Sequence, residues 1–148
     1  MFSFRILDTT HTAACLTILK STFSTPWKEI EHVFQNKAHF IWGAYKDHEL
    51  IAFIVMSIVA NEAEILTCAV TQACQQQGVG HALLTYVCSE LKQKKVDEVY
   101  LEVDITNEAA KRLYTKIGFH QVGERKAYYP QLDGSYTNAL IMRLLLNN

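Results

Sequence analysis

Apolar residues recur along the chain with two different periods. Alternation of apolar and polar positions predicts a strand, whereas apolar positions three and four residues apart predict one face of a helix. Strand-like segments lie at 2–7, 39–45, 50–59, 64–70 and 96–105, and further strands follow from 119 onward, the last at 139–146. Helical spacing is found at 13–19, 26–34, 79–95 and 108–117. This order predicts a mixed α/β domain in which helices cover a central sheet.

Capping and turn residues mark several boundaries of these elements. Asp8 can cap the first helix, and Pro26 lies near the first position of the second helix, beside Trp27. Gly118 can end the fourth helix. The polar segment 46–49 separates two strands and predicts a hairpin.

Length and composition limit the chain to one folded unit. With 148 residues, 49% of them hydrophobic, we expect a single domain over 1–148. The chain has 14 Lys and Arg against 15 Asp and Glu, a formal net charge of −1. A strongly basic surface is therefore not indicated, and we expect no direct nucleic-acid partner.

The N-terminal segment does not have the pattern of a secretory signal. Arg5 and Asp8 interrupt it where such a signal needs an unbroken apolar run, and no segment approaches the roughly 18 apolar residues of a membrane span. We therefore expect a cytoplasmic protein with no membrane partner. The four cysteines have neither Cys-x-x-Cys spacing nor paired histidines, so we expect no metal site and reduced, largely buried thiols.

A strand, a short loop and a helix start follow one another over 66–81, with glycines at 78 and 80. A helix that begins in this way directs several backbone N–H groups and the positive end of its dipole toward one point. A phosphate or pyrophosphate is a natural ligand there, and Gly78 and Gly80 would permit a close approach to the backbone. The alternative is a glycine-containing helix entry that binds nothing.

Two further residues are candidates for proton transfer. Glu102 lies in the middle of an alternating strand, where it belongs either to a solvated sheet face or to a cleft that suits a general base. Tyr114 belongs to the inward stripe of the helix 108–117. It is either a core residue or, if it faces the same cleft as Glu102, a proton donor.

Taken together, the three segments resemble the GNAT acetyltransferases from about residue 62 to the C-terminus. The resemblance rests on Gln75-Gln-Gln-Gly78-Val-Gly80, Leu101-Glu102-Val103 and the helix from Asn107 through Ala110 and Tyr114 to Gly118-Phe119. It implies an α/β (α+β) fold with a mixed, mostly antiparallel sheet of about seven strands, split in a V and flanked by about four helices. Within the family, the chain looks most similar to the bacterial ribosomal-protein-alanine N-acetyltransferases. That similarity rests on Pro26-Trp27, Glu64-Ile-Leu, Arg125-Lys-Ala-Tyr128-Tyr129-Pro130, Asp133-Gly134 and Ala139-Leu-Ile-Met142.

The resemblance implies acetyl-CoA as co-substrate and no metal. It assigns Glu102 as general base, acting through water, and Tyr114 as general acid for the departing thiolate. It places the acetyl and pantetheine end along the backbone of Cys68, Ala69 and Val70, and has Asn107 contact the cofactor arm. The pyrophosphate would lie on the N–H groups of Gln76, Gln77, Gly78, Val79, Gly80 and His81. No cysteine nucleophile is implied.

The resemblance implies that the acceptor is the N-terminal amine of a small-subunit ribosomal protein, with alanine as its first residue. We expect the enzyme to act as a monomer or weak dimer. Asp104, Thr137 and Asn138 depart from the related pattern near the expected acceptor groove. Two alternatives therefore stay open: acetylation of a small amine such as a polyamine, amino acid or antibiotic, and a module that binds acyl-CoA without turnover.

The segment 125–129 has two interpretations. Tyr128 and Tyr129 either shape the acceptor pocket or pack as strand aromatics on the sheet. Arg125 and Lys126 are expected to be solvated.

Overall fold

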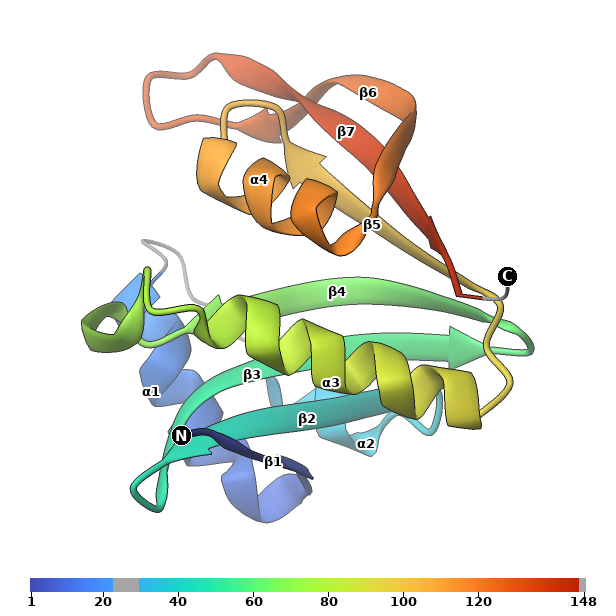
Figure 1. Ribbon diagram of the computed structural model, residues 1–148. Helices are drawn as coiled ribbons and strands as arrows, with labels where there is room; N and C mark the ends of the chain where they lie inside the picture. Colours follow the sequence, from blue (N-terminus) through green and yellow to red (C-terminus); the bar gives the residue numbers. More distant parts are fainter. Residues whose placement is uncertain (23–29, 147–148) are drawn as a thin grey trace.

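The computed structural model describes residues 1–22 and 30–146, which form a seven-stranded sheet with helices on both faces (Figure 1). The strands are β1 (Ser3–Ile6), β2 (His39–Lys46), β3 (Glu49–Val59), β4 (Glu62–Val70), β5 (Glu98–Asp104), β6 (His120–Pro130) and β7 (Tyr136–Leu145). The helices are α1 (Thr12–Thr22), α2 (Ile30–Gln35), α3 (Val79–Gln93) and α4 (Glu108–Ile117), with 3-10 turns η1 (Thr9–His11) and η2 (Gln72–Cys74). The predicted mixed α/β fold is confirmed.

The strand order is β1-β2-β3-β4-β5-β7-β6, and among the strands of the described residues only β4 and β5 pair in parallel. Helices α3 and α4 lie on one face of the sheet, and α1 and α2 lie on the other (Figure 1). Each face has its own apolar core. One core joins the inner face of α3 to residues such as Ile54 and Leu101, and the other joins α1 and α2 to residues such as Phe53.

Most element boundaries agree with the sequence pattern to within two residues. The β2–β3 hairpin is confirmed: Asp47 and His48 have φ angles of 51° and 68°, and two successive positive φ angles are typical of the type I′ turn that suits strand twist. The turns η1 and η2 were not predicted, because three residues are too short for a period to show. Asp8 caps η1 rather than α1, and Pro26 and Trp27 lie outside the described residues.

The sheet opens between its two parallel strands. Pairing of β4 with β5 extends only from Glu62 and Glu98 to Ile65 and Leu101, although β4 continues to Val70. The register of β3 against β4 also shifts between Val55 and Met56, which leaves one extra residue in β4 just after Ile65. Such a bulge bends a strand, and it lies where β4 turns away from β5. The expected V-shaped split is therefore confirmed, and its open end is visible between β4 and β5 in Figure 1.

None of the described helices is both long and apolar enough to cross a membrane. The four cysteines are free thiols.

Candidate functional site

The open edge of β4 forms one wall of the split. Thr71 N–H donates to the carbonyl of Ile51 at 2.8 Å, which places Thr71 in the ladder with β3. Because hydrogen-bonded and non-hydrogen-bonded positions alternate along an antiparallel pair, the N–H and C=O groups of Val70 and Cys68 point away from β3. Those of Ala69 point toward β3. Cys68 therefore presents its backbone groups to the split, as a strand edge that lacks its neighbour. Val70 presents its N–H group there, because its carbonyl accepts a hydrogen bond from Gln75 Nε2 at 3.1 Å.

A helix start lies at the end of this wall. Gly78 is the N-cap of α3 in a left-handed conformation, with φ of 82°, and it makes no side-chain cap. Gln76, two residues earlier, also has a positive φ of 63°. The first turn of α3 contains no acidic residue, so its N–H groups and the helix dipole offer a positive end without a neighbouring carboxylate. This geometry is suited to an anion.

The two glycines of the loop have different surroundings. A Cβ atom on Gly78 would meet nothing within 4 Å, whereas one on Gly80 would lie 3.3 Å from Leu113 Cδ2. Gly80 is therefore explained by the close packing of α3 against α4, and Gly78 by its backbone conformation. His81 lines a groove between α3, the end of α4 and the C-terminal segment, together with Lys92 and Lys116.

Asn107 caps α4. Its Oδ1 atom accepts a hydrogen bond from Ala110 N–H at 3.1 Å. The cap fixes where α4 begins relative to the end of β5, and thus where the helix places Tyr114.

Glu102 is the first residue of β5 beyond the point where pairing with β4 stops. Its neighbours Leu101 and Val103 are buried in the core beneath α3 and α4. Because side chains alternate along a strand, Glu102 points to the opposite face, where 22% of its side chain is exposed. Glu102 thus lies at the open part of the split, on the side of α1 and α2.

Tyr114 approaches the split from the other face, on α4. It is buried and packs edge to face against Phe119, with ring centroids 5.6 Å apart. Burial raises the pKa of its hydroxyl, and the neighbouring Cys68 and Tyr129 raise it further, so the phenol is neutral at physiological pH. The hydroxyl forms no hydrogen bond with any described residue, which leaves its proton available.

Tyr129 interacts electrostatically with both candidates. Burial raises its pKa to about 12, and the charges of Glu102 and Asp104 act in the same direction. The same side chain also influences Tyr114. Of the two adjacent tyrosines, Tyr129 therefore faces the site, whereas the Tyr128 side chain is 47% exposed and stacks edge to face on Tyr129.

Arg125 is exposed, as expected, with 55% of its side chain accessible to solvent. It also has a partner that the sequence did not indicate, because its Nε atom lies 2.7 Å from Glu102 Oε1. Sequence reasoning missed this contact because β7 separates the two strands. The conformation of β6 is also unusual at Ala127, whose φ is 51° and whose N–H donates to Asn138 Oδ1 at 2.9 Å.

Asp104 also has partners within the protein. Burial raises its pKa, but hydrogen bonds from the backbone and hydroxyl of Thr106 outweigh this effect, and the net pKa is lowered. Gln131 Nε2 lies 3.3 Å from Asp104 Oδ2 and 3.0 Å from Thr137 Oγ1, so it ties the β6–β7 turn to the end of β5.

Metal and thiol chemistry have little support in the described part of the chain. No group of three or more His, Cys, Asp or Glu side chains there could hold a metal ion. Burial raises the pKa of Cys68 to about 12, so its thiol is protonated and a weak nucleophile at neutral pH.

Comparison with known proteins points to one family. Residues 9–119 match the acetyltransferase (GNAT) family. The [ribosomal protein bS18]-alanine N-acetyltransferase of Haemophilus ducreyi is 35% identical over 122 residues, which cover 82% of this chain and 84% of that protein. The crystal structure of the ribosomal-protein-S18-alanine N-acetyltransferase from Escherichia coli superimposes with a TM-score of 0.92 at 31% identity, covering 100% of this chain and 96% of that one. Arabidopsis thaliana NAA60 in complex with acetyl-CoA shares the fold, with a TM-score of 0.84 at 20% identity, and covers 100% of both chains.

Proposed function

The chain is an N-acetyltransferase of the GNAT family, and from this premise we propose that it transfers the acetyl group of acetyl-CoA to the N-terminal α-amine of a small-subunit ribosomal protein, with alanine as the acetylated residue. The observation that carries the proposal is that Glu102 and Tyr114 approach one split from opposite faces of the sheet. A direct transfer needs a base on the acceptor side and an acid on the thiolate side.

The residues along the split fit acetyl-CoA. The backbone groups of Cys68 would bind its amide-containing arm as an added strand binds a sheet edge, next to the N–H group of Val70. The N–H groups at the start of α3, from Gln76 to His81, would hold the pyrophosphate. Because the loop has glutamines and no arginine, this binding rests on backbone donors and the helix dipole. Asn107, at the start of α4, would contact the same arm.

Glu102 would accept the proton of the acceptor amine, directly or through a water molecule. The task is modest for an α-amine, whose pKa of about 7.7–8.0 leaves on the order of a tenth of it unprotonated at pH 7. A lysine amine, with a pKa of about 10.4, would be far less ready to react. The site therefore suits an N-terminal amine better than a lysine side chain.

Tyr114 would donate its proton to the departing thiolate. Its neutral hydroxyl has no partner among the described residues, so no hydrogen bond has to be broken first. The N–H group of Val70, which points into the split, would stabilise the negative charge that develops on the carbonyl oxygen. The protein then needs no metal and no covalent intermediate.

The ribosomal acceptor is inferred from relatives whose names state that activity. The small-amine alternative arose because residues such as Asp104 depart from the related pattern near the expected acceptor groove. Asp104 accepts hydrogen bonds from Thr106 and Gln131, which favours a structural role for this residue over contact with an acceptor amine.

The test is acetyl transfer from labelled acetyl-CoA to hexapeptides that begin with Ala, Ser, Gly or Met, beside spermidine and free lysine. Mass spectrometry locates the acetyl group. We expect labelling of the α-amine, fastest for the Ala peptide. Transfer to the small amines alone would replace the proposed acceptor, and tight binding of acetyl-CoA without transfer to any acceptor would replace the enzyme by a binding module.

A further inference from the structure

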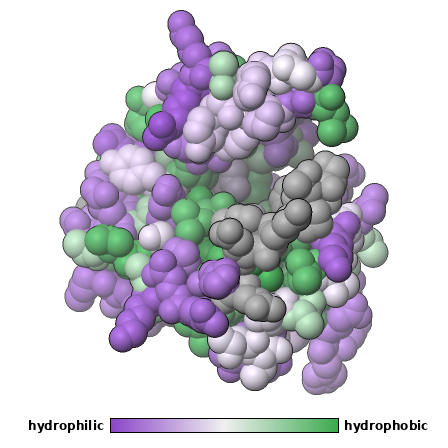
Figure 2. All heavy atoms as spheres, turned by 180° about the vertical axis from the view of Figure 1, so that it is seen from behind, coloured by the Kyte–Doolittle hydropathy of each residue, from purple (hydrophilic) through white to green (hydrophobic). Residues whose placement is uncertain are grey.

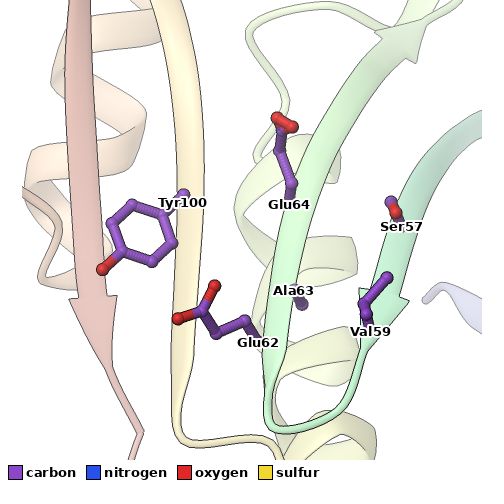
Figure 3. A pocket seen from close by; sticks show the side chains of 6 residues that line it. All are labelled: Ser57, Val59, Glu62, Ala63, Glu64 and Tyr100. Atoms are coloured by element: carbon purple, nitrogen blue, oxygen red, sulfur yellow. The ribbon is translucent and has the colours of Figure 1, made fainter.

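A cavity of about 380 Å³ lies on β3, β4 and β5, beside the closed end of the split. It is lined by Ser57, Val59, Glu62, Ala63, Glu64 and Tyr100. Figure 3 shows the Glu62 carboxylate directed toward the ring of Tyr100, with Glu64 farther along the same strand.

The charge of Glu62 and Glu64 in this cavity is not balanced by a partner among the described residues. Glu62 and Glu64 are exposed, and neither forms a hydrogen bond or an ion pair with the described residues. Glu62 also pairs directly with Glu98 across the β4–β5 ladder, where like charges destabilise each other. Glu98 has partners in Arg143, at 3.9 Å, and in the Tyr100 hydroxyl, whereas Glu62 and Glu64 have none in the described chain. A cation bound beside Glu62 and Glu64 would relieve the repulsion between Glu62 and Glu98.

The cavity lies on the same face of β5 as the proposed acceptor site, nearer the closed end of the split. Tyr100 and Glu102 project from the same face of β5, and Glu64 pairs with Tyr100. At about 3.3 Å per residue, Glu64 lies on the order of 7 Å along the strand from the level of Glu102, and Glu62 on the order of 13 Å. Seen from the side of α1 and α2, the surface is hollowed between the part that carries β6 and β7 and the part below it (Figure 2).

We propose that Glu62, Glu64 and Tyr100 form a subsite for a lysine or arginine side chain of the acceptor chain, about two to four residues after the acetylated residue. This inference rests on the proposed function, because it takes the acceptor amine to lie at Glu102. An extended peptide that starts there advances about 3.3 Å per residue and reaches the two glutamates within that number of residues. Tyr100 adds an aromatic ring beside the cation.

The negative charge of Glu62 and Glu64 favours a basic segment of the acceptor chain as the occupant of this cavity. The relatives are named for a ribosomal protein substrate, and proteins that bind RNA depend on Lys and Arg to neutralise phosphates. A basic N-terminal segment would bring to this surface the charge that it lacks.

The experiment compares two Ala-initiated hexapeptides that differ only by Lys or Gln at position four. We expect the wild type to acetylate the Lys peptide about three- to tenfold more efficiently in kcat/KM at low salt, with a smaller ratio in 0.5 M salt, on the order expected for partly exposed charge pairs. The double variant Glu62→Gln/Glu64→Gln should lose this preference and still acetylate the Gln peptide at the wild-type rate. Glu49→Gln, an exposed glutamate at the start of β3, is the matched control and should keep the preference.

Equal rates for both peptides with the wild type, or a preference that the double variant retains, would overturn the subsite. If the wild type acetylates neither peptide, the proposed function fails. Binding of the two peptides to the acetyl-CoA-loaded protein, measured by calorimetry, then decides on the subsite separately: tighter binding of the Lys peptide that depends on Glu62 and Glu64 supports it, and equal binding overturns it.

Discussion

Arg125 reaches Glu102 across an intervening strand. The two residues belong to β6 and β5, between which β7 lies, and the Arg125 Nε atom is nevertheless 2.7 Å from Glu102 Oε1. Arg125 pairs with Ala139 of β7, whose small side chain lets the arginine pass over the strand. The proposed base is therefore held from the β6–β7 hairpin, the part of the chain that also contributes Tyr129.

We expect Arg125→Gln to lower turnover more than stability. The pair is half exposed, so its loss should change the free energy of unfolding by less than about 1 kcal/mol. Turnover should fall about tenfold, because the Glu102 carboxylate is no longer held in one position. Urea unfolding and steady-state kinetics on the same preparation measure the two effects. Arg125→Lys should restore part of the turnover, and unchanged kinetics in Arg125→Gln would show that the contact has no role in positioning Glu102.

Substitution of the proposed base or the proposed acid should leave the protein folded. Glu102→Gln and Tyr114→Phe should each lower kcat by about 10²–10⁴, the usual contribution of a positioned proton-transfer group, with little change in acetyl-CoA affinity. The Tyr114 hydroxyl has no hydrogen-bond partner among the described residues, so Tyr114→Phe should alter the free energy of unfolding by less than about 0.5 kcal/mol.

Tyr128→Phe is the matched control for Tyr114→Phe, because Tyr128 belongs to the same hairpin as Tyr129 but is 47% exposed. It should retain wild-type turnover. Wild-type rates in both Glu102→Gln and Tyr114→Phe would refute the assigned roles, and a large loss of acetyl-CoA affinity in either would assign the residue to cofactor binding.

Local patterns predicted the elements of the site but not its contacts. Alternation along β5 correctly placed Glu102 on the face opposite Leu101, because a period of two depends only on neighbouring residues. The helical stripe likewise placed Tyr114 inward. The Arg125–Glu102 contact depends instead on the order β5-β7-β6 and on the register break in β6 around Ala127. An alanine with positive φ has no sequence signature, and Asn138, which holds it, could be identified only once β6 and β7 were paired.

Stability should decrease at alkaline pH because of buried thiols. Burial raises the pKa of Cys15 and Cys68 to about 12 and that of Cys88 to about 11, from an ordinary value of 9.0. Above pH 9 the unfolded chain releases these protons while the folded chain keeps them, so the stabilisation is complete below pH 9 and is lost as the pH rises. Each thiol should lower the free energy of unfolding by up to about 1.4 kcal/mol per pH unit.

Urea unfolding under reducing conditions, from pH 7.5 to 10.5, measures this slope. Cys88→Ala should be less stable at neutral pH but should show a shallower alkaline slope than the wild type. An identical slope in the two proteins would mean that Cys88 titrates alike in the folded and unfolded chains.

Substitution of two glycines can distinguish the effect of backbone strain on stability from an effect on cofactor binding. Gly78, at the start of α3, and Gly134, in the β6–β7 turn, have φ angles of 82° and 87°, and an added Cβ would meet nothing within 4 Å at either position. Gly78→Ala and Gly134→Ala should therefore each destabilise the fold by about 1 kcal/mol, the cost of a left-handed conformation with a side chain.

If the N–H groups after Gly78 hold the pyrophosphate, Gly78→Ala should also weaken acetyl-CoA binding about tenfold, because a charge-assisted hydrogen bond is lost or bent. Gly134→Ala should bind acetyl-CoA as the wild type does. Thermal unfolding and calorimetric titration of both variants make the comparison, and equal affinities in the two would place the pyrophosphate elsewhere than on the loop before α3.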